Sequence, residues 1–149
     1  MSVTIDTNIL IYVVDDRDPV KQSVAGEVFS ALAIRSAPLA LQVIGEFQNA
    51  SVRRLKHPPS LAAASASQLL ASFQTFGYDK AAVARATSLF AVSQLSYWDA
   101  LLVASVEAAG LRCLISEDMH DGGRHFGVEI VNPFLGDGLS PRARAVLNL

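Results

Sequence analysis

Hydrophobic and polar positions along the chain switch between a spacing typical of strands and one typical of helices. Short apolar runs predict strands at residues 2–5, 39–42, 112–116 and 126–131, and a short strand or extended link at 73–78. Between them, apolar residues recur three and four positions apart, which predicts amphipathic helices. These helices are expected at residues 7–14, 20–35, 43–56, 61–73, 80–94 and 97–109.

Polar residues and prolines at the ends of these stretches support the predicted boundaries. Ser60, Asp79 and Ser96 each precede a helical pattern and are typical helix N-caps. Pro19 suits the first turn of a helix, and Gly110 is typical of the residue after a helix end. The boundaries therefore agree with the periodicity.

Strands that alternate with helices predict an α/β domain, with parallel crossovers and a sheet covered on both faces. A chain of 149 residues is the usual size of one domain, and no internal linker is long enough to divide it. We expect one domain over residues 1–135. Residues 136–149 are expected to form a C-terminal tail with a short helix, since Ser140-Pro141-Arg142 resembles a helix start.

Composition narrows the possible classes of protein. About half of the residues are hydrophobic, which allows a sizeable core, and no apolar run approaches the ~20 residues of a membrane span. Asp6 interrupts the first apolar run, so a signal peptide is not expected and we predict a cytoplasmic protein. The single cysteine excludes an internal disulfide and a cysteine-built zinc site.

The net charge of −2 argues against strong nonspecific nucleic-acid binding but does not exclude a nucleic-acid substrate. Bound cations would reverse the field at an acidic site. The basic segment Arg53-Arg54-Leu55-Lys56-His57 could hold phosphates. It could equally complement the dipole at a helix C-terminus, and the two roles are compatible.

Four acidic residues occupy positions where active sites of α/β proteins gather. Asp6 and Asp118 follow predicted strands, Asp99 lies in the first turn of a helix, and Glu46 flanks the buried face of another. Each has a structural explanation when taken alone. Asp6 and Asp99 could cap helices, Glu46 could be solvated, and Asp118 could form a turn.

Their convergence at one cleft would be hard to explain by packing. Two unit charges ~4 Å apart repel by ~4 kcal/mol at an effective dielectric of 20, and a fold is stable by only ~5–15 kcal/mol. Either some of the acids are protonated or a cation lies among them. All-oxygen ligands favour Mg²⁺ or Mn²⁺ over zinc.

The chain resembles the PIN-domain ribonucleases, and among them the VapC-type toxins of VapBC toxin–antitoxin systems. The segment Ile5-Asp6-Thr7-Asn8-Ile9-Leu10 resembles the Asp-Thr-Asn motif of that family. The helix that begins Tyr97-Trp98-Asp99-Ala100 and continues to Ser105 resembles its central Asp motif. The next residue is Val106, where the motif has alanine. Ser116-Glu117-Asp118-Met119 resembles its last acidic motif, and Glu46 has the spacing of its helical acid.

The resemblance implies a three-layer α/β/α PIN-like domain with a central parallel sheet of four or five strands. It implies an acidic pocket in which Asp6 and Asp99 hold Mg²⁺ or Mn²⁺, and Asp118 and Glu46 complete the shell or hold a second ion. Thr7 would orient Asp6, Asn8 and Ser96 would hydrogen-bond the carboxylates or a bound water, and Asp121 would be an optional addition.

The function implied is hydrolysis of RNA phosphodiesters by the toxin of a type II toxin–antitoxin pair. The partners implied are an RNA substrate, a cognate antitoxin and a second copy in a homodimer, with no membrane. We expect the antitoxin on an apolar surface of the first helices that includes Ile11, Tyr12, Val24 and Val28, unless these residues are core.

Three alternatives belong to other classes. A phospho-receiver domain needs a lysine after a late strand, and the only lysines are Lys21, Lys56 and Lys80. An aspartyl phosphatase needs Asp-x-Asp after the first strand, where this chain has Asp6-Thr7-Asn8. A noncatalytic PIN-like module that binds RNA or protein stays open, although such modules usually lack some of the four acids.

Overall fold

The computed structural model describes residues 1–149 and has a four-stranded central sheet in the order β1-β4-β6-β5. Its strands are β1 (Val3–Ile5), β4 (Cys113–Ile115), β5 (Arg124–His125) and β6 (Val128–Val131). Two small pairs lie outside it, β2 (Leu39–Ala40) with β3 (Thr75–Phe76), and β7 (Phe134–Leu135) with β8 (Gly138–Leu139). The helices are α1 (Thr7–Val14), α2 (Pro19–Ile34), α3 (Leu41–Arg53), α4 (Pro59–Ser72), α5 (Lys80–Val92), α6 (Tyr97–Ala108) and α7 (Pro141–Leu147).

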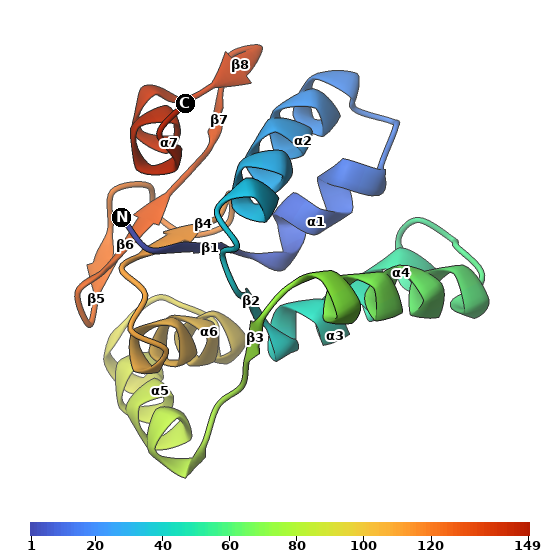
Figure 1. The fold of residues 1–149 in the computed structure, drawn as a ribbon. Helices are drawn as coiled ribbons and strands as arrows, with labels where there is room; N and C mark the ends of the chain where they lie inside the picture. The colour runs from blue at the N-terminus through green and yellow to red at the C-terminus, as the bar shows by residue number, and fades with distance from the viewer.

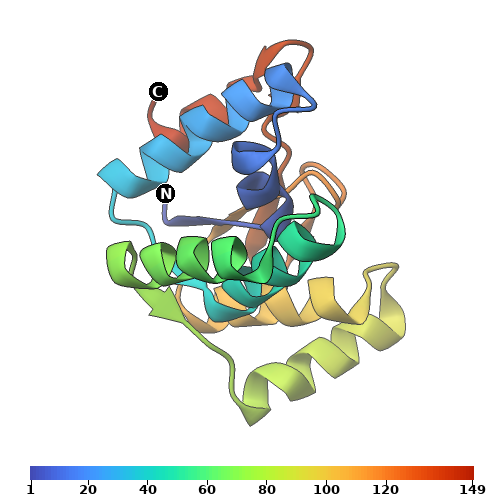
Figure 2. The same ribbon diagram turned by 90° about the vertical axis from the view of Figure 1, so that its right-hand side faces the viewer.

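Helices cover both faces of the sheet, so the predicted three-layer architecture is confirmed (Figure 1). One layer contains α1, α2 and α7, and the other contains α5 and α6. The α3–α4 pair projects beside the sheet, between the two layers, as the turned view in Figure 2 shows. None of the helices is both long and apolar enough to cross a membrane.

The central sheet is parallel except at one edge. β1 and β6 both run parallel to β4, whereas β5 pairs antiparallel with β6. Ile5 lies opposite Ile115, and Ile115 lies opposite Val131, so the three parallel strands end together. The residues that follow β1 and β4 therefore emerge side by side, and the backbone N–H of Asp6 donates to the carbonyl of Ile115 at 2.9 Å.

The residues of β1, β4 and β6 are buried along their whole length, as expected for parallel strands with helices on both sides. Apart from Thr4 and Glu129, which are buried polar residues, they belong to a core of 33 buried hydrophobic residues. A second, smaller cluster joins α5 to α6 through Ala82, Ala86, Ala100, Leu101 and Ala104. These mostly small side chains allow the two helices to pack closely against each other.

Most predicted boundaries agree with the structure to within a few residues, but several differ. The second strand ends at Ala40, because Leu41 already begins α3. Ser60 does not cap α4; the N-cap position is Pro58, which makes no side-chain hydrogen bond, and Pro59 begins the helix. Strand β5 and the β7–β8 hairpin were not predicted, since neither forms an apolar run of strand length in the sequence.

The short helix expected in the tail is present as α7, capped by Ser140. Its Ala143, Val146 and Leu147 are buried and belong to the main core. Residues 136–149 thus pack against the body of the domain, next to α2.

Candidate active site

The four predicted carboxylates line one pocket at the carboxyl ends of β1 and β4. The pocket has a volume of about 730 Å³, and Asp6, Glu46, Asp99 and Asp118 all contribute to its wall. The predicted supporting residues Thr7 and Asn8 line it as well. The parallel register of β1 and β4 thus brings together residues distant in sequence, such as Asn8 and Asp118, which are 110 positions apart.

Asp6 is the most deeply buried of the four acids, with only 5% of its surface exposed. It caps α1 by accepting a hydrogen bond from the N–H of Thr7 at 2.6 Å, and its second oxygen accepts from the hydroxyl of Ser116 at 2.7 Å. Burial raises the pKa of the Asp6 carboxyl from 3.8 to about 6, against these two hydrogen bonds, and the charges of Asp99 and Asp118 raise it further.

Glu46 is held at both of its carboxylate oxygens. The hydroxyl of Thr7 donates to one oxygen at 2.7 Å, and the side-chain amide of Gln42, one turn earlier on α3, donates to the other at 2.9 Å. Thr7 therefore contacts Asp6 through its backbone and Glu46 through its side chain. This fixes the relative positions of two of the acids.

Asp99 lies in the first turn of α6, which begins after the N-cap Ser96. The hydroxyl of Ser96 accepts a hydrogen bond from the N–H of Asp99 at 3.1 Å. Burial raises the pKa of the Asp99 carboxyl; the Ser96 hydroxyl lowers it, and the negative charges of Asp118 and Glu46 raise it. Ser96 does not line the pocket, and its observed hydrogen bond is to the backbone of Asp99, as the N-cap of α6.

Asp118 is exposed and lies on the loop after β4. The side-chain amide of Asn8 donates to it at 2.9 Å, and its own N–H donates to the hydroxyl of Ser116 at 3.2 Å. Ser116 is fully buried and therefore joins Asp6 to the Asp118 loop. The neighbouring Glu117 turns away from the pocket and pairs with Lys21 of α2.

Asp121 was expected as an optional member of the site, but it does not line the pocket. Its carboxylate accepts a hydrogen bond from the N–H of Asn132 at 2.8 Å and so ties the loop after β4 to the end of β6. This is the turn-stabilising role that its sequence context also allowed.

Three residues that line the pocket, Gln42, Asn49 and Trp98, were not assigned a role from the sequence. Neither was the buried Ser116, which does not line the pocket but donates to Asp6. Ser116 precedes an acidic motif, but a buried serine at a strand end has no distinctive pattern. Along α3 a polar residue of the pocket recurs every three or four positions, at Gln42, Glu46, Asn49 and Arg53. This polar stripe would have identified the α3 wall of the pocket from the sequence. Arg53 and Arg54, flagged as possible phosphate ligands, do line the pocket.

The donor chemistry of the pocket suits a hard cation. All four acidic groups present oxygen, and two buried amide oxygens at the site, Asn8 Oδ1 and Gln42 Oε1, have no hydrogen-bond partner. No group of three or more His, Cys, Asp or Glu side chains is arranged to hold one ion. Mg²⁺ in proteins usually keeps several waters and is bound through one or two carboxylates, so it does not require three such groups arranged around one point.

Replacing Ser116 by alanine tests the buried link between Asp6 and Asp118. We expect Ser116→Ala to lose about 1.5–3 kcal/mol of unfolding free energy at neutral pH, the usual contribution of a hydrogen bond to a charged group. Because that hydrogen bond lowers the pKa of Asp6, the pKa should rise further in the variant. Urea unfolding measures the first effect, and NMR titration of the carboxyl measures the second.

Ser105→Ala is the matched control, since Ser105 is also buried and donates only to the Leu101 carbonyl within α6. A Ser116→Ala protein whose stability and Asp6 pKa both match those of Ser105→Ala would contradict the link.

Comparison with known proteins agrees with this geometry. Residues 3–120 match the model of the PIN domain family, and the chain therefore belongs to that family. No curated protein sequence matches it closely enough to count as a relative.

Solved structures of similar fold come from three bacteria. VapC20 of Mycobacterium tuberculosis, a sarcin–ricin-loop-cleaving toxin, is 18% identical with a TM-score of 0.61, over 76% of this chain and 87% of VapC20. A toxin–antitoxin complex from Klebsiella pneumoniae gives 19% identity and a TM-score of 0.63, over 90% of this chain and 98% of the other. FitAcB from Neisseria gonorrhoeae gives 15% identity and a TM-score of 0.65, over 88% of this chain and 97% of the other. The predicted PIN fold is confirmed.

Proposed function

We propose that this protein is a Mg²⁺- or Mn²⁺-dependent endoribonuclease and the toxin of a type II toxin–antitoxin pair. The observation that carries the proposal is the convergence of Asp6, Glu46, Asp99 and Asp118 on one pocket. Burial and mutual repulsion raise the pKa of both Asp6 and Asp99, so binding of a proton or of a cation in the pocket is favourable. A purely structural role would not require these acids to meet.

Asp6 and Asp99 would hold the principal ion, and Asp118 and Glu46 would complete its shell through water or hold a second one. When bound, the ion supplies a water of lowered pKa and neutralises charge that develops on the phosphate. The protein contributes fixed oxygens. Ser116 and the Thr7 N–H hold Asp6, Thr7 and Gln42 hold Glu46, and Asn8 holds Asp118.

The toxin part of the proposal is supported by the structural neighbours, since one is a sarcin–ricin-loop-cleaving toxin and another is a toxin–antitoxin complex. The alternative is a noncatalytic PIN-like module that binds RNA or protein. The retention of all four acids, each with hydrogen-bonding support or a raised pKa, favours the enzyme.

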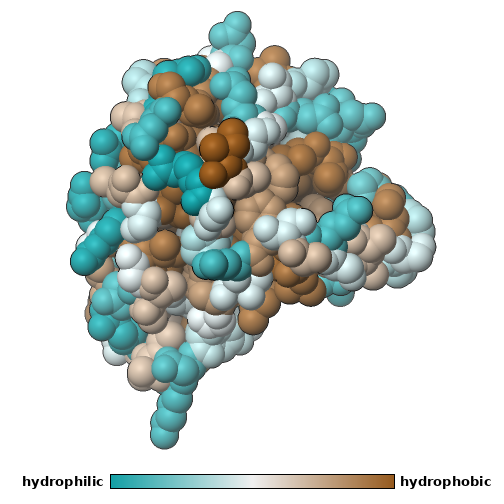
Figure 3. Space-filling model, in the orientation of Figure 1, coloured by the Kyte–Doolittle hydropathy of each residue, from teal (hydrophilic) through white to brown (hydrophobic).

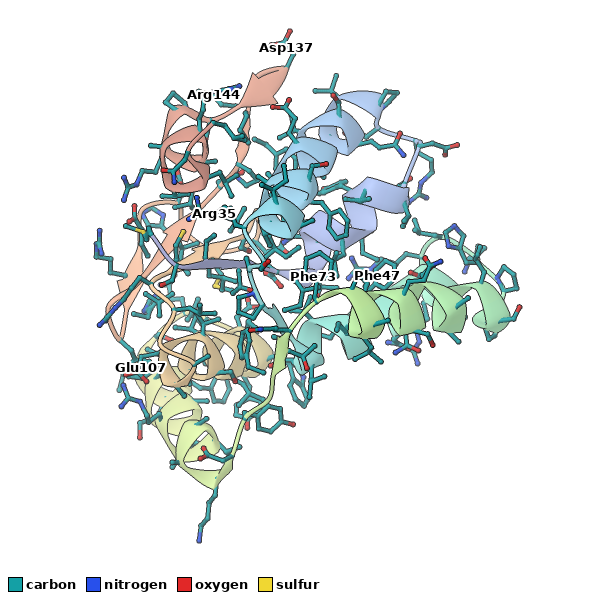
Figure 4. The ribbon with its side chains drawn as sticks, viewed as in Figure 1. Arg35, Phe47, Phe73, Glu107, Asp137 and Arg144 are labelled. Atoms are coloured by element: carbon teal, nitrogen blue, oxygen red, sulfur yellow. The ribbon has the colours of Figure 1, made fainter.

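This protein has an apolar surface suited to binding an antitoxin. Ile11, Val24 and Val28, which were expected to be either groove or core, are core residues, and Tyr12 packs against them. A separate cavity of about 410 Å³ opens between the α1–α2 and α3–α4 pairs, and most of its lining is apolar. Apolar side chains show in this hollow in Figure 3, and Phe47 and Phe73 are labelled beside it in Figure 4.

We propose this groove as the antitoxin surface and a homodimer as the free form. Co-purification with the product of a neighbouring reading frame tests the first, and light scattering tests the second. Loss of the complex when Phe73 is replaced by aspartate would support the groove, whereas an unchanged complex would contradict it.

Cleavage of total RNA by the purified protein tests the catalytic proposal directly. With Mg²⁺ or Mn²⁺ we expect products that carry a 5′-phosphate and a 3′-hydroxyl, located by sequencing of RNA 5′ ends. Chelation with EDTA should stop cleavage, and added Mn²⁺ should restore it, because the acids alone repel the phosphate. Cleavage that continues in EDTA would exclude the metal-dependent mechanism, and binding without cleavage would favour the noncatalytic module.

A further inference from the structure

We propose that Trp98 stacks on a base of the RNA next to the cleaved phosphate, while Arg53 and Arg54 hold a phosphate at the other end of the pocket. This inference rests on the proposed function and adds residues that contact the substrate. Trp98 lines the pocket directly before Asp99, yet 59% of its surface is exposed. An indole left in water at the edge of an acidic pocket indicates a surface that binds a ligand.

The position of Trp98 is fixed before any ligand arrives. Its backbone carbonyl accepts a hydrogen bond from Gln42 at 3.0 Å, and the same amide group holds Glu46. Its ring contacts Tyr97 edge-on, with centroids 5.2 Å apart, and Tyr97 contacts Phe90 in the same manner at 5.9 Å. Edge-on contacts cover little of the indole, so a base would meet a rigid and accessible ring.

The basic end of the pocket is formed by α3. Arg53 lies seven residues after Glu46 on the same stripe, which places it roughly 10 Å further along the helix axis. Arg53 and Arg54 are exposed, and neither forms an ion pair with an acidic residue. Free guanidinium groups bind phosphate oxygens well, often through two parallel hydrogen bonds.

The order of these groups matches the chemistry of a nucleic-acid strand. Along α3, Gln42, which contacts the Trp98 carbonyl, comes before Glu46, and the two unpaired arginines come after it. Stacking on aromatic rings and neutralisation of phosphates are two common means by which proteins bind unpaired nucleotides. A protein partner could also use tryptophan and arginine as anchors, and the experiment must distinguish that outcome.

Trp98 is the only tryptophan in the chain, so intrinsic fluorescence reports on it alone. Asp6→Asn protein, used to keep the RNA intact, would be titrated with a short unpaired RNA and with the same strand carrying abasic sites. We expect the RNA to quench the emission and the abasic strand to leave it unchanged. In that background, Trp98→Ala should weaken RNA binding by about 5- to 150-fold, the range for the loss of one stacked base. Trp98→Phe should retain most of the affinity.

The arginines are tested by salt dependence. Arg53→Gln together with Arg54→Gln should weaken binding of both strands and reduce the slope of log affinity against log salt by about 1.4, or 0.7 for each contact. Arg144→Gln on α7 is the matched control, because it removes an exposed charge on a helix outside the pocket. It should leave the slope unchanged.

Three results would overturn the stacking role: RNA that binds without quenching, equal RNA affinity of the Trp98→Ala protein and its parent, or emission that changes only with protein concentration. The last would assign Trp98 to an interface between copies. Any of them leaves the nuclease proposal intact if RNA is still cleaved. Conversely, quenching without cleavage by the wild type would retain the stacking role and refute the nuclease.

Discussion

Replacing Asp99 by asparagine is expected to reduce RNA cleavage by roughly 1,000-fold, because the change removes several kcal/mol of electrostatic stabilisation. Asparagine keeps the shape of the side chain, and the N–H of residue 99 can still donate to Ser96. The helix cap is therefore preserved while the charge is lost. Single-turnover cleavage at saturating Mg²⁺ would measure the effect, and thermal melting would show that the fold persists.

Asp137→Asn is the matched control for this substitution. It makes the same chemical change at an exposed position next to the β7–β8 hairpin, outside the pocket (Figure 4). We expect its cleavage rate to equal that of the wild type. Undiminished cleavage by the Asp99→Asn protein would refute the assigned role of Asp99.

Replacing Asp6 by asparagine is expected to stabilise the metal-free protein at neutral pH while it abolishes cleavage. The pKa of Asp6 rises from 3.8 to about 6 on folding, mainly because the carboxyl is buried. Between these two values the folded state binds more protons than the unfolded state, so stability falls as the pH rises from about 4 to about 7. Asparagine carries no charge at any pH and avoids this loss.

The shift of about two units corresponds to about 3 kcal/mol at most, and we expect a gain of about 1–3 kcal/mol at pH 7.5 that disappears near pH 4. Urea unfolding in EDTA at the two pH values would measure it, with Asp137→Asn as the neutral reference. Added Mg²⁺ should then stabilise the wild type more than the variant. A variant that is less stable than the wild type at pH 7.5 would show that the Asp6 charge is favourable to the fold.

The fold could be predicted largely from local patterns. Parallel strands with both faces buried give continuous apolar runs such as Val3–Ile5 and Cys113–Ile115, and caps such as Asp79 and Ser96 mark helix starts clearly. The hairpin β7–β8 was missed because its two-residue strands are defined by pairing across a turn. Pairing of this kind has no periodicity to detect.

Three acids of the candidate site could be predicted because Asp6 and Asp118 come after strands and Asp99 lies in the first turn of a helix, where the topology gathers ligands. Glu46 lies inside α3 and was predicted from its spacing alone. The residues that support these acids could not be predicted. Ser116 and Gln42 act through hydrogen bonds to Asp6 and Glu46, residues distant in sequence or one turn away on α3. Such contacts depend on the three-dimensional arrangement of elements, which a single sequence does not determine.

Adjacent residues of α3 belong to two different surfaces. Glu46 lines the acidic pocket, and Phe47 lines the apolar groove between the helix pairs. Since an α-helix moves as a stiff rod, a molecule that wedges into the groove and shifts α3 must carry the Glu46 carboxylate with it. An inhibitor bound in the groove could then stop the proposed RNA cleavage without entering the acidic pocket.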